Sequence, residues 1–170
     1  NTYKLTLIAL LAALAVAGRF IFSFLPNIQP VTSIIIVCGL ILGPTAAILL
    51  TLLTAFLSNM LLGMGIWTIW QIVSWSVIGL MSGLLGRLKT NIPMPILLLY
   101  AIFCGYFYGF VISLTTYQIT GKFFPYYLMG LPFDTYHAIG NALFILLLYP
   151  IITYFLKKYS NGRFTIQNTS

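Results

Sequence analysis

The chain has 170 residues and a formal net charge of +7, with 61% of its residues hydrophobic and only 5% charged. Soluble domains carry about 25% charged residues, so this composition and a mean hydropathy of +1.04 exclude a soluble protein. The few basic residues stand at the ends of apolar runs, which is typical of membrane orientation signals and excludes a nucleic-acid-binding surface. We therefore expect an all-α integral membrane protein with a single membrane domain over residues 1–170.

Six apolar segments follow one another, at about residues 4–24, 31–43, 45–62, 67–86, 92–116 and 134–156. A full bilayer crossing takes about 20 residues. The second segment is short for this and is expected to be tilted, thin or partly re-entrant. The first segment lacks the small-residue cleavage pattern of a signal peptide, so we expect it to remain as a span.

The first segment combines a face of small residues with a charge. Ala9, Ala13 and Ala17 recur every four positions, and such a face lets another helix approach closely, although alanine can also simply fill a helix. Arg19 lies near the end of the same segment. At that depth an arginine is paired, faces water, or extends its side chain to the interface.

Polar side chains mark the next two connections. The loop 23–30 carries two prolines together with Asn27 and Gln29, and Asn59 follows Ser58 at the end of the third segment. Polar side chains inside hydrocarbon need hydrogen-bonding partners. We therefore expect these groups to meet others from the same end of the bundle.

The turn after the third segment is rich in glycine and tryptophan. Trp67, Trp70 and Gln71 are spaced at i, i+3 and i+4, so they share one helical face. This face fits an aromatic belt at the membrane interface. It also fits a wall that stacks against a ligand and hydrogen-bonds it.

The last segment contains the only acid and the only histidine of the chain. If a helix begins near Asp134, then Asp134, His137 and Asn141 lie on one face. Asp134 either caps that helix or belongs to a site, with Arg19 as its expected ion partner. His137 fits a satisfied core histidine as well as a ligand contact. Tyr126 and Tyr127 fall in the long connection 117–132 before this segment.

The basic residues predict the orientation of the six spans. With the N terminus inside, only Lys122 lies in an external loop, and the cytoplasmic side receives Lys4, Arg87, Lys89, Lys157, Lys158 and Arg163. The positive-inside rule therefore predicts that both termini are cytoplasmic. The polar and aromatic groups then gather at the outer mouth of the bundle, as in a binding site that opens outward.

The residue set argues against catalysis and against a metal site. One histidine and one acid supply at most two ligands, fewer than zinc takes. The sequence has neither a nucleophile elbow nor a Walker A motif, and its two cysteines lack disulfide or metal spacing. Its acid and its histidine sit near one end, whereas proton-coupled transporters place such groups along a path through the membrane. A binding subunit that depends on a partner for energy fits best.

In these features the chain resembles the S component, the substrate-binding membrane subunit, of energy-coupling factor (ECF) type ABC transporters for vitamins. The resemblance covers nearly the whole chain, and the face of Ala9, Ala13 and Ala17 is similar to the AxxxA surface that docks on the coupling subunit. It implies a bacterial cytoplasmic membrane protein in contact with the lipid bilayer. It also implies a transmembrane coupling subunit and two ATPase subunits as partners. No cofactor is implied, because the partners use the ATP and the vitamin is the substrate.

Within this family, four outer stretches are most similar to the branch associated with cobalamin: Arg19 with residues 25–32, residues 58–59, residues 65–71, and residues 131–134 with His137, Gly140 and Asn141. The residues expected to bind substrate are Arg19, Asn27, Gln29, Asn59, Trp67, Trp70, Gln71, Tyr126, Tyr127, Asp134, His137 and Asn141. One alternative is a small vitamin or precursor such as the hydroxymethylpyrimidine of thiamin, stacked on a tryptophan and bound by Asp134 and His137. A different class is a membrane scaffold subunit without a ligand.

Overall fold

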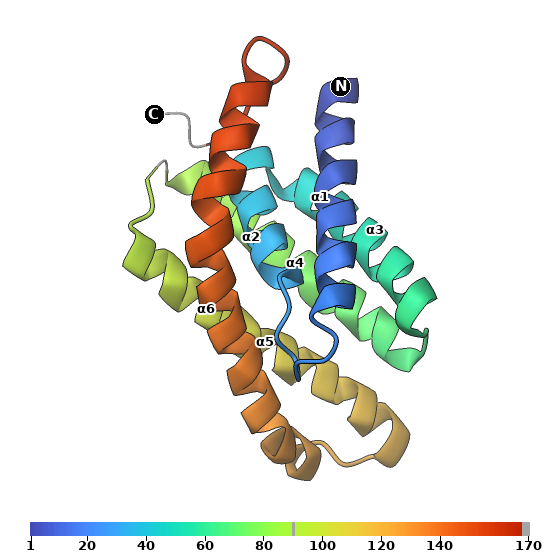
Figure 1. Cartoon of the computed structure of the whole chain (residues 1–170). Helices are drawn as coiled ribbons and strands as arrows, with labels where there is room; N and C mark the ends of the chain where they lie inside the picture. Colours follow the sequence, from blue (N-terminus) through green and yellow to red (C-terminus); the bar gives the residue numbers. More distant parts are fainter. Residues whose placement is uncertain (90, 168–170) are drawn as a thin grey trace.

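The computed structural model describes residues 1–89 and 91–167. Over these residues the chain forms six helices: α1 (Thr2–Ile21), α2 (Val31–Leu42), α3 (Pro44–Leu62), α4 (Ile66–Leu88), α5 (Met94–Thr120) and α6 (Phe124–Ser160), shown in Figure 1. Five of them are long and apolar enough to cross a membrane, and α2 is a shorter apolar helix. The predicted all-α membrane protein with a short second segment is confirmed.

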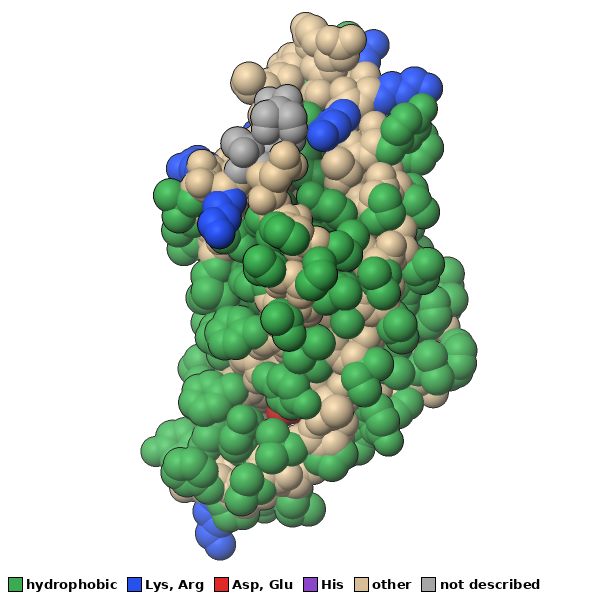
Figure 2. All heavy atoms as spheres, turned by 90° about the vertical axis from the view of Figure 1, so that its left-hand side faces the viewer, with side chains coloured by type: hydrophobic (Ala, Val, Ile, Leu, Met, Phe, Trp, Pro, Cys, Tyr) green, Lys and Arg blue, Asp and Glu red, His purple; other side chains and the backbone are tan. Residues whose placement is uncertain are grey.

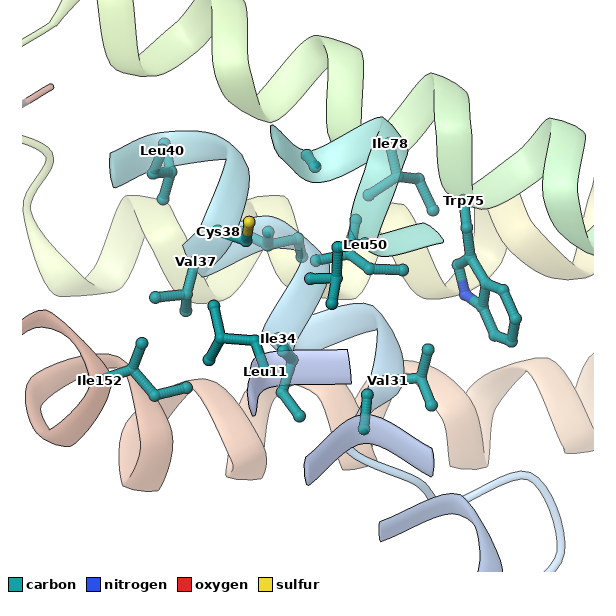
Figure 3. Close-up of a cluster of buried hydrophobic side chains, with 14 of the residues drawn as sticks. Leu11, Val31, Ile34, Val37, Cys38, Leu40, Leu50, Trp75, Ile78 and Ile152 are labelled. Carbon is teal, nitrogen blue, oxygen red and sulfur yellow. The ribbon is translucent and has the colours of Figure 1, made fainter. Parts of the chain in front are cut away.

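The short helix α2 forms the centre of the bundle. All 12 of its residues are buried, and it contacts each of the other five helices. Figure 3 shows its side chains Val31, Ile34 and Val37 within the apolar core, which also receives Leu11 from α1, Leu50 from α3, Trp75 from α4 and Ile152 from α6. Because protein surrounds α2 on every side, its length of about 18 Å does not have to match the bilayer. The expected short segment is thus a helix buried in protein, and its expected tilt or re-entrant course stays a prediction.

Glycines allow α2, α3 and α4 to pack this closely. A Cβ atom at Gly83 of α4 would overlap Pro44 at the start of α3, and one at Gly86 would overlap the Leu40 carbonyl of α2. Small residues at helix crossings let the backbones approach closely. The van der Waals contacts made there drive helix association inside a membrane.

The last helix is longer than the sequence predicted. We expected a connection over 117–132 and a span from about residue 134, whereas α5 continues to Thr120 and α6 begins at Phe124. Gly121, with φ of +70°, makes the turn between them. Pro132 lies inside α6, because neighbouring groups in a bundle compensate for the hydrogen bond that a proline removes. Asp134 is therefore an interior residue of α6, and the predicted capping role is wrong.

Both ends of the described chain lie at the same end of the bundle, where the Asn1 side chain donates to the Arg163 carbonyl at 2.6 Å (Figure 1). Figure 2 shows most of the visible Lys and Arg side chains gathered at this end, and basic side-chain atoms also at the tip of the far end. Lys122 occupies the α5–α6 turn, on the side predicted to be external. We call these the inner and the outer end, following the positive-inside rule.

Candidate functional site

Polar and aromatic side chains from every helix meet inside the bundle toward its outer end. We refer to them as the outer polar cluster, which comprises Arg19, Asn27, Thr32, Ser58, Asn59, Gln71, Trp75, Tyr108, Asp134 and His137. Most of these side chains are buried. Six of the ten are among the residues that the sequence predicted, and the helices bring them together from separate parts of the chain.

Arg19 forms one branch of the cluster. Its Nη1 donates to Ser58 Oγ at 2.6 Å and to Asn59 Oδ1 at 3.2 Å. The Asn59 amide in turn donates to Gln71 Oε1 at 2.6 Å. The guanidinium also lies 5.7 Å from the centre of the Trp75 ring. A charge at this depth needs such dipoles and ring faces around it.

The expected ion pair between Arg19 and Asp134 is not formed among the described residues. The spacing of Asp134, His137 and Asn141 correctly predicted that they share the inward face of α6. The spacing within one helix does not determine which neighbouring helix that face contacts. In the fold, Arg19 of α1 faces α3, against which α1 packs most, while Asp134 of α6 faces α5. Neutral hydroxyl and amide groups take the place of the carboxylate as partners of the guanidinium.

His137 is the centre of the second branch. The Trp75 indole donates to Thr32 Oγ1 at 2.9 Å, and Thr32 Oγ1 lies 2.8 Å from His137 Nε2. On the other side of the ring, Nδ1 lies 3.2 Å from Asn27 Oδ1, while the Asn27 amide donates to the Phe133 carbonyl at 2.9 Å. A neutral ring with the proton on Nδ1 satisfies all of these contacts, so we assign that tautomer from the network.

Three aromatic rings stack across this branch. Tyr108 of α5 lies between His137, at a centroid distance of 4.7 Å, and Trp75, at 5.1 Å. Asn27 reaches the histidine from the α1–α2 loop with a left-handed backbone, φ 59°, a conformation that asparagine tolerates better than most residues. Both nitrogens of His137 are thus held by protein groups, as in a satisfied core histidine.

Asp134 differs from the rest of the cluster because part of it is unsatisfied. Its side chain is 6% exposed and lies against Gly109 of α5, where a Cβ atom would overlap the carboxylate. Its Oδ2 has no hydrogen-bond partner among the described residues. A buried polar oxygen without a partner is costly, so this carboxylate retains capacity for a donor from outside the chain.

Asn141 and Gln29 lie on either side of the cluster. Asn141 is about one turn deeper in α6, and its amide donates to the Ala101 carbonyl of α5 at 3.1 Å. Gln29 lies outside, where the α1–α2 loop and the end of α1 line a cavity of about 210 Å³ together with Arg19 and Asn27. This loop covers the cluster from the outer side.

Four predicted residues lie apart from the cluster, at the outer rim. Trp67 and Tyr126 are each 42% exposed. The Trp70 indole donates to Gln118 Oε1 at the end of α5 at 3.0 Å, and Tyr127 packs against Phe110 and Phe123. The predicted role of these rim residues in substrate binding stays a prediction.

Sequence reasoning missed Trp75 and Tyr108 as members of the site. Trp75 follows Gln71 by four residues and so shares its face, which is a usable signal. Tyr108 lies between Gly105 and Gly109, two positions where α6 approaches α5 closely. In a chain this apolar, however, an aromatic residue is just as typical of a lipid-facing surface.

The face of Ala9, Ala13 and Ala17 lies on the outside of α1. All three residues are exposed, whereas Ile8, Leu11, Ala12 and Ala15 form the buried face of the helix. The alanine face is accessible to another helix, and the predicted docking of a partner there stays a prediction.

One comparison with known proteins bears on the role of this fold. A family model described as "ECF-type riboflavin transporter, S component" matches residues 1–111. The matched part includes α1 to α4 and most of α5, and therefore every member of the outer polar cluster except Asp134 and His137. No solved structure matches the chain. The match supports an S component but does not support the cobalamin branch, since the name of the family points to riboflavin.

Proposed function

The chain belongs to the ECF-type riboflavin transporter S component family, and from this premise we propose that it captures a vitamin in the outer polar cluster for ATP-driven uptake. It is a multi-pass protein of the cytoplasmic membrane and the substrate-specificity subunit of a transporter, which is not an enzyme. The energy would come from partners, a membrane coupling subunit and two ATPase subunits.

The Asp134 carboxylate carries the proposal: it is buried within a cluster of amides and aromatic rings, and its Oδ2 has no hydrogen-bond partner in the part of the chain that the structure describes. Ligand sites in helical bundles lie between helices, with apolar walls and a few convergent polar groups. The cluster has this composition. The cavity of about 210 Å³ beside Arg19 lies between it and the outer loop, so entry of a ligand would require the loop 22–30 to move aside.

Riboflavin, the vitamin in the name of the family, is the first candidate. Its flat ring system has an imide edge that presents carbonyl oxygens beside an N–H group. The Asn59 and Gln71 amides, which now hydrogen-bond each other at 2.6 Å, would exchange that bond for the imide edge. Asp134 would accept from hydroxyls of the ribityl chain, and Trp75 or Tyr108 would stack on the ring.

Cobalamin is the second candidate, favoured by the resemblance of the four outer stretches. A corrinoid is far larger than the cavity of about 210 Å³, so it would remain near the mouth. There it would contact the rim residues Trp67, Tyr126 and Tyr127. The two candidates therefore differ in whether binding depends on the rim.

The test is calorimetric titration of the purified chain in detergent with riboflavin, cobalamin and hydroxymethylpyrimidine. We expect one vitamin to bind with submicromolar Kd. Gln71→Ala should weaken a buried riboflavin at least about tenfold, because it removes a hydrogen bond inside the site, while Tyr126→Ala leaves it unchanged. The opposite dependence would identify cobalamin. Failure of every vitamin to bind would contradict capture by this subunit alone and would favour a scaffold.

A further inference from the structure

The cleft between α1 and α6 at the inner end has no role in the function described above. α1 packs mainly against α3 and α2. The residues that flank α1 reach α6 and the turn after it, through the hydrogen bond of Asn1 with Arg163 at the inner end and the edge contact of Phe22 with Phe144 of α6 at 5.2 Å. Between these points a cavity of about 360 Å³ remains, lined by Tyr3, Thr6, Leu7, Leu10, Tyr159 and Arg163, among others.

The chemistry of this cleft changes along its length. Its membrane side is apolar and continues into Leu10 and Leu14, exposed side chains of α1. Its inner side has the phenol rings of Tyr3 and Tyr159, which are 60% and 50% exposed. Tyrosines of this kind mark the depth of the lipid headgroups. The cleft thus runs from the hydrocarbon region to the interface.

Arg163 supplies the charge at the interface end. Its guanidinium is held 5.3 Å above the Tyr3 ring, and its Nη1 donates to the Tyr159 carbonyl at 3.1 Å. Arginine has five N–H donors in a rigid fork, so this single hydrogen bond leaves the group able to bind a phosphate with two parallel bonds.

The charges of the whole chain favour an anionic ligand in the cleft. The net charge is +7 and the single acid of the chain is Asp134, which is buried in the cluster toward the outer end. Figure 2 shows basic side chains around the inner end, above a broad hydrophobic surface. Anionic headgroups of the cytoplasmic leaflet gain about 1 kcal/mol for each nearby Lys or Arg.

We propose that the α1–α6 cleft binds one anionic phospholipid of the cytoplasmic leaflet, with an acyl chain between Leu7 and Leu10 and the phosphate on Arg163. This inference is independent of which vitamin the chain captures. α1 and α6 pack mainly against other helices, so the lipid would occupy the space between them.

The experiment is native mass spectrometry of the full delipidated chain with equal amounts of dioleoylphosphatidylglycerol and dioleoylphosphatidylcholine. We expect one phosphatidylglycerol to be retained about fivefold more than phosphatidylcholine, the preference of one arginine for an anionic headgroup. Arg163→Gln should abolish the preference, whereas Lys158→Gln, which removes a charge at the same end outside the cleft, should preserve it.

A second pair of variants tests the acyl-chain part of the site. Thr6 is exposed and its hydroxyl donates to the Thr2 carbonyl of the same helix at 3.0 Å, so Thr6→Trp fills the cleft without disturbing the core. It should abolish retention because the indole fills the space of the acyl chain, and Leu5→Trp, at an exposed position outside the cleft, should not. Equal effects of Arg163→Gln and Lys158→Gln would overturn the proposal, and so would retention in Thr6→Trp or displacement of the lipid by inorganic phosphate.

Discussion

The Thr32 hydroxyl connects α2, α4 and α6, because it accepts from the Trp75 indole at 2.9 Å and lies 2.8 Å from His137 Nε2. Thr32→Val keeps the shape of the side chain but leaves both buried nitrogens without a partner. Each such group costs about 1–3 kcal/mol. We expect the free energy of unfolding to fall by at least about 2 kcal/mol, measured by thermal and denaturant unfolding in detergent.

Ser113→Ala is the matched control for Thr32→Val. Within the described ranges the Ser113 hydroxyl bonds only to the Gly109 carbonyl of its own helix, at 2.9 Å, so its loss should change the stability by no more than about 0.5 kcal/mol. A similar loss in both variants would mean that Thr32 has no special place in the network.

Gly109 determines how deeply Asp134 lies in the bundle. Because an added Cβ atom would overlap the carboxylate, Gly109→Ala should displace Asp134 and weaken vitamin binding at least about tenfold, as expected when a buried charged group loses its place. Gly130→Ala is the control, since a Cβ atom there meets nothing within 4 Å and alanine favours a helix. Titration calorimetry would separate the two, and unchanged affinity in Gly109→Ala would remove Asp134 from the site.

At the residue scale, sequence reasoning identified the unusual residues but not their partners. Arg19, Asn59, Gln71, Asp134 and His137 stand out because polar side chains are rare in apolar segments. Their partners depend on how each helix is rotated against its neighbours, which periodicity within one helix does not report.

At the element scale, the number and order of the helices followed from hydropathy, whereas two details did not. The length of α2 showed that it was too short to span comfortably, but apolar residues on all sides fit burial in protein as well as contact with lipid. Pro132 suggested a helix boundary. In the fold it lies inside α6, which extends from Phe124 to Ser160.

The exposed face of α1 permits a test of partner docking. Ala13 is exposed, so Ala13→Trp should leave the fold and vitamin affinity unchanged while preventing close approach of a partner helix. We expect uptake in cells to fall at least about tenfold. Leu143→Trp, at a position of α6 that is 54% exposed, should transport normally. Normal uptake by Ala13→Trp would show that the partner docks elsewhere.

At the scale of the whole molecule, the orientation in the membrane can be measured with added cysteines. The native Cys38 and Cys104 are buried and should not react with maleimides. Lys122→Cys in the α5–α6 turn should react with a membrane-impermeant maleimide in intact cells. Asn161→Cys, just after α6, should react only after permeabilisation, and the reverse pattern would invert the assignment of inner and outer ends.

The central position of α2 has a consequence for ion leakage. Its polar side chains, Thr32 and Ser33, occupy the first turn at the outer side, and the nine residues from Ile34 to Leu42 that follow are apolar or glycine and all buried. Over these nine residues the side chains of α2 therefore offer no oxygen or nitrogen that could hydrogen-bond water or a hydrated ion beneath the outer cluster. Many copies of the subunit can then reside in the membrane without proton leakage along α2. If the proposed vitamin capture is right, α2 offers the vitamin no polar path inward, and release to the cytoplasm would require the packing around the outer cluster to change.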